Sequence, residues 1–144
     1  MVFPRMPRAK IIVVEDNKSE VFLIRRALLM QTEDLDLEVA EDGERALQFV
    51  QGQREHLPGS EPCVILLDLH LPKHDGIEVL RAIRKEPLLS HIYVVVTTNG
   101  ASPEEEEQLR SLGADFRLKP RDLLQFSELA ADLIAIGEGL RSGV

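Results

Sequence analysis

Five short runs of strand character, not all of them wholly apolar, alternate along the chain with five amphipathic segments of helical spacing, and this alternation limits the fold more than any other feature. The runs are residues 11–14, 37–40, 64–67, 92–96 and 114–118. They are short and bounded by turn residues, as buried strands are. Strands that alternate with helices are typical of a parallel sheet covered by helices on both faces, with right-handed crossovers. The sequence therefore predicts a doubly wound α/β fold, with a five-stranded parallel sheet flanked by five helices.

The predicted helices begin at residues suited to capping. Three of them show capping-box spacing, at Asn17 and Glu20, at Ser102 and Glu105, and at Asp122 and Gln125. The helix after Ser102 has few apolar positions, chiefly Leu109 and Leu112, and is expected to be the least firmly packed. A chain of 144 residues is most simply one domain. We place this domain at residues 10–137, between tails at 1–9 and 138–144.

Composition narrows the classes of partner and the compartment. The net charge of −8 and the pI near 5.0 argue against nucleic acid or anionic membrane as partners. The single cysteine, Cys63, excludes an internal disulfide framework and favours a reducing compartment. The apolar run at 11–14 is too short for a signal peptide or a membrane span. We therefore expect a cytoplasmic protein.

Polar residues follow several of the predicted strands at the point where each strand ends. Glu15 and Asp16 follow the first strand, Asp68 the third, Thr98 the fourth and Lys119 the fifth. In a parallel sheet these carboxyl ends lie along one edge, which is also where open α/β sheets bind ligands. The topology alone is therefore expected to bring these distant residues together.

Three carboxylates in one crevice repel each other unless a cation lies among them. Mg²⁺ prefers oxygen ligands and is commonly held by one or two carboxylates together with phosphate oxygens. His70 and His74 follow Asp68 but lack a second soft ligand at a spacing usual for zinc. The acids therefore favour Mg²⁺ as the cofactor.

The remaining residues of this edge suit phosphoryl transfer to an aspartate. Asp68 offers a carboxylate nucleophile, and the metal neutralises phosphoryl charge. Lys119 supplies a compact positive charge, and the Thr98 hydroxyl can donate to a phosphoryl oxygen. The more specific hypothesis is that the Asp68 carboxylate is phosphorylated to an acyl phosphate. The simpler alternative is a structural site in which Lys119 only pairs with the acids.

The chain resembles the receiver domain of two-component response regulators from Lys10 to about Gly137. The motifs are the acidic pair Glu15-Asp16, Asp68 in LLDLHLP followed by Asp75-Gly76, Thr98 after VVV, and Lys119-Pro120. Thr98 lies 30 residues after Asp68 and 15 before Gly113, both as in that family, and Thr97 is the fallback. The DLHLPKHDG run, the long loop before Pro62 and the absence of an output domain look similar to the stand-alone regulators that accompany phytochrome-type kinases.

The resemblance implies a set of roles. A sensor histidine kinase or a histidine phosphotransfer protein phosphorylates Asp68. Asp16, Asp68 and the backbone carbonyl of His70 hold Mg²⁺, while Glu15 acts through a metal-bound water. Thr98 and Lys119 contact the phosphoryl group. The resemblance also implies the strand order 2-1-3-4-5 and a cis Lys119–Pro120 bond.

Phe116 matches the switch aromatic of the family but lacks the hydroxyl of the commoner Tyr. The stretch from Gly113 to Lys119 is one residue shorter than the family pattern. Phosphorylation is expected to shift the conformation of the loop after Thr98 and of the Phe116 ring. The output is then binding to an unknown partner, to a downstream phosphotransfer protein or to a second copy of the chain.

Three alternatives stay open beside a signalling switch that is not an enzyme. A metal-dependent phosphatase would need a second acid two residues after Asp68, where this chain has His70. A flavodoxin-like cofactor binder would need a loop rich in Gly, Ser and Thr to hold a phosphate, and three acids would repel it. The last alternative is a receiver-shaped adaptor that is never phosphorylated.

Overall fold

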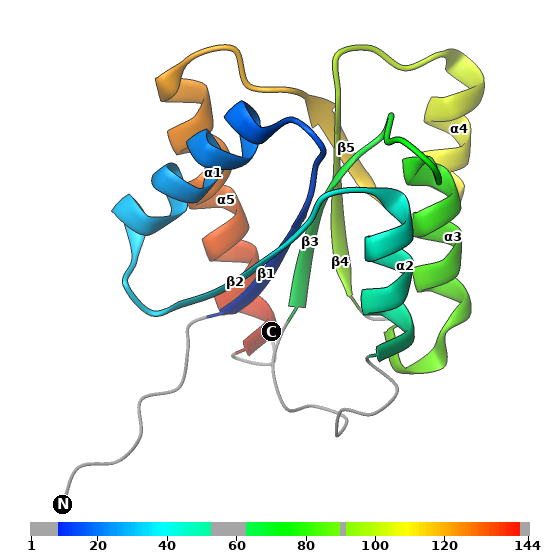
Figure 1. Ribbon diagram of the computed structural model, residues 1–144, viewed down its shortest axis with the longest axis horizontal. Helices are drawn as coiled ribbons and strands as arrows, with labels where there is room; N and C mark the ends of the chain where they lie inside the picture. The colour runs from blue at the N-terminus through cyan, green and yellow to red at the C-terminus, as the bar shows by residue number, and fades with distance from the viewer. Residues whose placement is uncertain (1–8, 53–62, 90–91, 142–144) are drawn as a thin grey trace, which may run out of the picture.

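The computed structural model, which describes residues 9–52, 63–89 and 92–141, is a five-stranded parallel sheet between two layers of helices (Figure 1). The strands are β1 (Ala9–Val14), β2 (Leu35–Ala40), β3 (Cys63–Asp68), β4 (Tyr93–Thr98) and β5 (Asp115–Leu118). All four strand pairs are parallel, in the order β2-β1-β3-β4-β5. The predicted α/β class and the strand order are confirmed.

Helices cover both faces of the sheet. They are α1 (Lys18–Gln31), α2 (Gly43–Gly52), α3 (Gly76–Lys85), α4 (Pro103–Ser111) and α5 (Leu123–Arg141), with a short 3₁₀ turn at Pro87–Leu89. Figure 1 shows α1 and α5 on one side of the sheet and α2, α3 and α4 on the other. None of these helices is both long and apolar enough to cross a membrane within the described residues.

The alternation of side chains along β1 divides the core into two parts. Ile11 and Val13 pack with side chains of α1 and α5, whereas Ile12 and Val14 pack with those of α2 and α3. All four are at most 2% exposed, as expected for a strand buried on both faces. The sheet is therefore held from both sides, which places the ends of its strands firmly.

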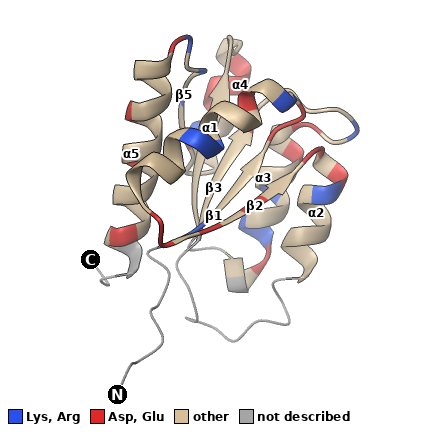
Figure 2. Ribbon diagram, turned by 60° about the vertical axis from the view of Figure 1, so that its left-hand side comes forward, with Lys and Arg blue, Asp and Glu red and all other residues tan. Residues whose placement is uncertain are grey.

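The start of α4 follows the expected capping box. The Ser102 hydroxyl accepts from the Glu105 amide, and the Glu105 carboxylate accepts in return from the Ser102 amide. Leu109 is the buried side chain of this helix, so α4 has little apolar anchoring, as the sequence predicts. Figure 2 shows the acidic first turn of α4.

Helix α5 runs to Arg141 and so continues past residue 137, where we place the end of the domain; that boundary stays a prediction. Glycines at 137 and 139 disfavour a helix by about 1 kcal/mol each. Packing outweighs this cost, because Gly137 is buried and Ile136 lies against the second core cluster. The predicted N-terminal tail and most of the long loop before Pro62 lie outside the described residues.

Backbone contacts hold the loop after Asp68 from two sides. A Cβ on Gly76 would lie 2.6 Å from the Asp68 carbonyl oxygen, so only glycine fits there without displacing the strand end. A Cβ on Gly43, at the start of α2, would likewise clash with the His74 carbonyl oxygen. Lys73 has a φ of 67° in this loop, and its ammonium lies 3.1 Å from a Glu44 carboxylate oxygen. The end of β3 is thereby fixed relative to α2.

Candidate functional site

Three acids meet at the carboxyl edge of the sheet. Carboxylate oxygens of Glu15, Asp16 and Asp68 all lie within 4.8 Å of one another. Glu15 and Asp68 are 7% and 4% exposed, whereas Asp16 is open to solvent. The three acids therefore meet at this edge, as the sequence predicted from the first and third strands. The structure adds that Glu15 and Asp68 are buried and Asp16 is accessible.

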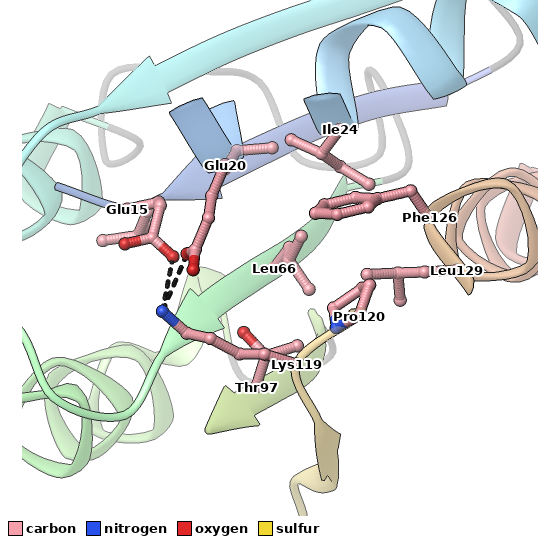
Figure 3. A pocket seen from close by; sticks show the side chains of 11 residues that line it. Glu15, Glu20, Ile24, Leu66, Thr97, Lys119, Pro120, Phe126 and Leu129 are labelled. Atoms are coloured by element: carbon pink, nitrogen blue, oxygen red, sulfur yellow. Dashed lines mark hydrogen bonds and ion pairs between the residues drawn. The ribbon is translucent and has the colours of Figure 1, made fainter. Parts of the chain in front are cut away.

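The Lys119 ammonium lies among the acids (Figure 3). Its Nζ is 2.9 Å from Glu15 Oε1, 2.8 Å from Glu20 Oε2 and 3.2 Å from Asp68 Oδ2. The side chain of Lys119 is only 12% exposed. The predicted pairing of Lys119 with the acids is thus present, although residues 15 and 119 are 104 positions apart.

Glu20 is the site residue that the sequence reasoning missed. Its spacing from Asn17 predicted a capping box, but only half of that motif forms. The Asn17 side chain accepts from the Glu20 amide, while the Asn17 amide donates to Glu15. The Glu20 carboxylate instead reaches Lys119. An acid one turn after the acidic pair is the sequence signal that points to this role.

Burial and mutual hydrogen bonding divide the charge among the acids. Burial raises the pKa of Glu15 to about 9, with the hydrogen bond to Glu20 adding to this effect and the Lys119 ammonium opposing it. Burial also acts to raise the pKa of Glu20, but its bonds to Glu15 and Lys119 outweigh burial and lower that pKa. Burial acts to lower the pKa of Lys119, yet its carboxylate partners raise it. Without metal, Glu15 is therefore protonated at neutral pH.

The two threonines at the end of β4 face different surroundings. The Thr97 carbonyl accepts from the Leu69 amide, and the Thr98 carbonyl accepts from the Lys119 amide. The Thr98 hydroxyl donates to the Gly100 carbonyl at 2.7 Å and accepts from the Gly100 amide at 3.1 Å. Thr97 lines the same cavity as Lys119. The hydroxyl of Thr98 is thus committed to the loop before α4.

His70 links the loop after Asp68 to α4. Its amide donates to Asp68 Oδ1 at 3.2 Å, and its Nε2 lies 3.1 Å from Glu105 Oε2. This hydrogen bond from the His70 backbone amide holds the Oδ1 oxygen of Asp68, whereas Lys119 contacts the Oδ2 oxygen. The side chain is 59% exposed, so the ring adds a surface contact to the capping acid of α4.

Phe116 lies on β5 with its ring packed against the first core cluster. The Arg110 guanidinium from α4 lies 5.8 Å from the centre of this ring. Such a stacked cation contributes about 0.5–1 kcal/mol at an exposed site. The aromatic ring and α4 are thus in direct contact.

The expectation of a cis Lys119–Pro120 bond is wrong, because the described residues contain no cis peptide bond. The trans isomer is intrinsically favoured before proline by about 0.5–1 kcal/mol. In this isomer the Lys119 amide still bonds to the Thr98 carbonyl, and the ammonium still reaches Asp68. The shorter stretch before Lys119 therefore does not displace the lysine.

The three acids fit a hard divalent cation. Mg²⁺ binds oxygen at 2.0–2.1 Å, so two ligands on opposite sides of the ion lie about 4.2 Å apart. The spacing of the acidic oxygens, all within 4.8 Å, is close to this requirement. Carboxylate oxygens are also the donors that Mg²⁺ prefers.

The cavity behind Lys119 is too small for an organic cofactor. It has a volume of about 20 Å³, which is room for about one water. Its polar end is formed by Glu15, Glu20 and Lys119, and its apolar end includes Leu66 and Phe126 (Figure 3). This cavity does not support the flavodoxin-like alternative.

Residues 11–130 match the family described as the response regulator receiver domain. The chain belongs to this family, the receiver domains of two-component signalling. The resemblance drawn from the acidic pair, Asp68, Thr98 and Lys119 is thus confirmed at the level of the family.

The relatives include regulators of phytochrome signalling. The chain is 37% identical to "Response regulator Rcp1" of Synechocystis sp. over 136 residues, which are 94% of this chain and 88% of Rcp1. It also resembles the crystal structure of the phosphorylated cyanobacterial phytochrome response regulator RcpA, with 33% identity, a TM-score of 0.76, and 94% and 96% of the two chains covered. For the Mn²⁺-bound form of Rcp1, identity is 34%, the TM-score 0.68 and coverage 93% and 92%.

Proposed function

We propose that this chain is a phosphoacceptor switch in which Asp68 receives a phosphoryl group from a sensor histidine kinase or a histidine phosphotransfer protein. One observation carries the proposal. The buried Asp68 carboxylate lies both in a cluster of three acids suited to Mg²⁺ and 3.2 Å from the Lys119 ammonium. A nucleophile, a metal site and a fixed cation are the parts that phosphoryl transfer to a carboxylate needs.

An Asp68 carboxylate oxygen attacks phosphorus, and the bond from phosphorus to the histidine nitrogen of the donor breaks as the new P–O bond forms. The electron pair of the broken bond stays on the imidazole. The carboxylates of Asp16 and Asp68 and the His70 carbonyl would hold Mg²⁺, with Glu15 completing the acidic set, and the ion supplies charge neutralisation. Lys119 donates to a phosphoryl oxygen.

The new acceptor on Asp68 competes for the Thr98 hydroxyl. That hydroxyl forms hydrogen bonds with both the carbonyl and the amide of Gly100. If it turns to the phosphoryl group, these hydrogen bonds break and the start of the loop before α4 is released. The helix that follows buries only one side chain and covers Phe116 with Arg110. A shift of the α4 and Phe116 region is therefore the proposed response, as a change of population between two arrangements.

Output is proposed to be binding to another protein in the cytoplasm or to a second copy of the chain. Large exposed apolar side chains lie on α1 and where β5 leads into α5. They are Phe22, Leu29, Met30, Leu118, Leu123 and Leu124. This apolar area suits a protein partner, whereas the acidic balance of the chain does not suit nucleic acid or membrane.

Incubation with Mg²⁺ and a small acyl phosphate tests the proposal by intact mass spectrometry. We expect one stable phosphoryl group per chain, lost in Asp68→Asn and kept in the control Asp36→Asn, which changes an acid on the edge strand β2. Turnover of many phosphate esters per chain would favour a phosphatase instead. No labelling with Mg²⁺ bound would favour an adaptor that is never phosphorylated.

A further inference from the structure

The ion pair between Glu20 and Lys119 connects α1 to the acidic edge. We propose that Glu20 is a positioning residue that takes a share of the Lys119 ammonium, which also contacts Glu15 and Asp68, and so leaves the side-chain oxygens of these two acids more available to Mg²⁺. This inference rests on the proposed function, because it assumes that the acidic cluster binds the metal. Glu20 thus affects Mg²⁺ binding indirectly, by its contact with Lys119.

The ammonium of Lys119 has three hydrogens, and side-chain oxygens of three acids are within reach of them. The shortest contact, 2.8 Å, is to Glu20, and the longest, 3.2 Å, is to Asp68. Glu20 is the one of these three partners that is not part of the acidic cluster. It therefore takes a share of the ammonium without occupying a candidate metal ligand.

Loss of the Glu20 charge leaves the ammonium with Glu15 and Asp68 as its remaining partners in this set. The Lys119 side chain is 12% exposed and cannot turn to bulk water easily. A buried ammonium stays paired, because an unpaired charge in such a place is costly. Lys119 would then bind both cluster acids more tightly, and Mg²⁺ would have to displace it.

The place of Glu20 is set by the chain itself. The Asn17 side chain caps α1 by accepting from the Ser19 and Glu20 amides at 2.9 and 3.1 Å. This cap points the first turn of α1 at the end of β1. The Glu20 side chain is 30% exposed, so a change at this position does not open the core. Figure 3 shows its carboxylate beside that of Glu15, both facing the ammonium.

A double-mutant cycle on Mg²⁺ affinity tests the proposal, with wild type, Glu20→Gln, Lys119→Met and the double variant titrated by calorimetry. Couplings between contacting residues are about 0.5–3 kcal/mol. We therefore expect Glu20→Gln to weaken Mg²⁺ binding about fivefold when Lys119 is present and less than about twofold in the Lys119→Met background. Equal weakening in both backgrounds would show a plain charge effect and overturn the proposal.

Glu44→Gln is the matched control, because Glu44 also lies in the first turn of a helix and pairs with a lysine, Lys73, at 3.1 Å. Its Mg²⁺ affinity is expected to stay within about twofold of wild type, and a loss as large as that of Glu20→Gln would also overturn the proposal. If wild type itself binds no Mg²⁺, the proposed function fails and this inference fails with it. If wild type binds Mg²⁺ and the cycle shows no coupling, only the positioning role fails.

Discussion

Glu15 makes the metal-free protein less stable as the pH rises through neutrality. Burial raises its pKa in the folded chain to about 9 from an ordinary value of 4.5. Between these values the folded chain holds a proton on Glu15 that the unfolded chain releases. The stability that this proton confers is complete below pH 4.5 and is lost progressively up to about pH 9.

The size of the effect follows from the linkage between proton binding and folding. One proton corresponds to about 1.4 kcal/mol per pH unit. From pH 6.5 to 8.5 the full shift would remove about 2.5 kcal/mol of the free energy of unfolding. Solvent at the edge of the site screens part of the charge, so we expect about 1 kcal/mol.

Urea unfolding followed by circular dichroism, in the presence of a chelator, measures this effect. Glu15→Gln removes the titrating group but keeps its shape, so the difference between wild type and variant isolates Glu15 from the histidines. Between pH 6.5 and 8.5, the free energy of unfolding of wild type is expected to fall by about 1 kcal/mol relative to that of the variant. Parallel pH curves for the two proteins would refute a protonated Glu15.

Two further predictions concern the metal and α4. Asp16→Ala removes the solvent-exposed acid of the cluster and is expected to weaken Mg²⁺ binding about tenfold or more in a calorimetric titration; an unchanged titration would move the metal elsewhere. Leu109→Ala removes the side chain that α4 buries and is expected to cost about 2–5 kcal/mol in urea unfolding, with faster amide exchange in α4 than in α5. Equal protection of both helices would contradict the weak anchoring of α4.

Much of the fold and the convergence of the site were predictable from the sequence. Short apolar runs such as 64–67, which are bounded by turn residues and alternate with amphipathic segments, indicate buried strands. Parallel topology then requires their carboxyl ends to meet. Parallel topology alone is enough to predict that Asp68 and Lys119 lie close together. The strand order came from the family resemblance, because apolar patterns do not say which strands are neighbours.

Other features depend on tertiary contacts that sequence patterns do not contain. Glu20 fits a capping box by spacing, but the buried ammonium of Lys119 competes for its carboxylate and outweighs the local bond. Glycines near residue 137 suggested a helix end, yet packing of α5 against the sheet carries the helix to Arg141. The Thr98 hydroxyl donates a hydrogen bond to the Gly100 carbonyl. The spacing between Asp68 and Thr98 in the sequence does not predict this partner.

The central claim is that Asp68 itself accepts the phosphoryl group, and residue-level mapping of the label tests it most directly. Borohydride reduces an acyl phosphate of aspartate to homoserine, which peptide mass spectrometry locates. After incubation with Mg²⁺ and a phosphohistidine donor, we predict homoserine at position 68 and unmodified acids at positions 15 and 16. Homoserine at either of those acids, or a phosphoryl group on a hydroxyl side chain with Asp68 unmodified, would contradict the account.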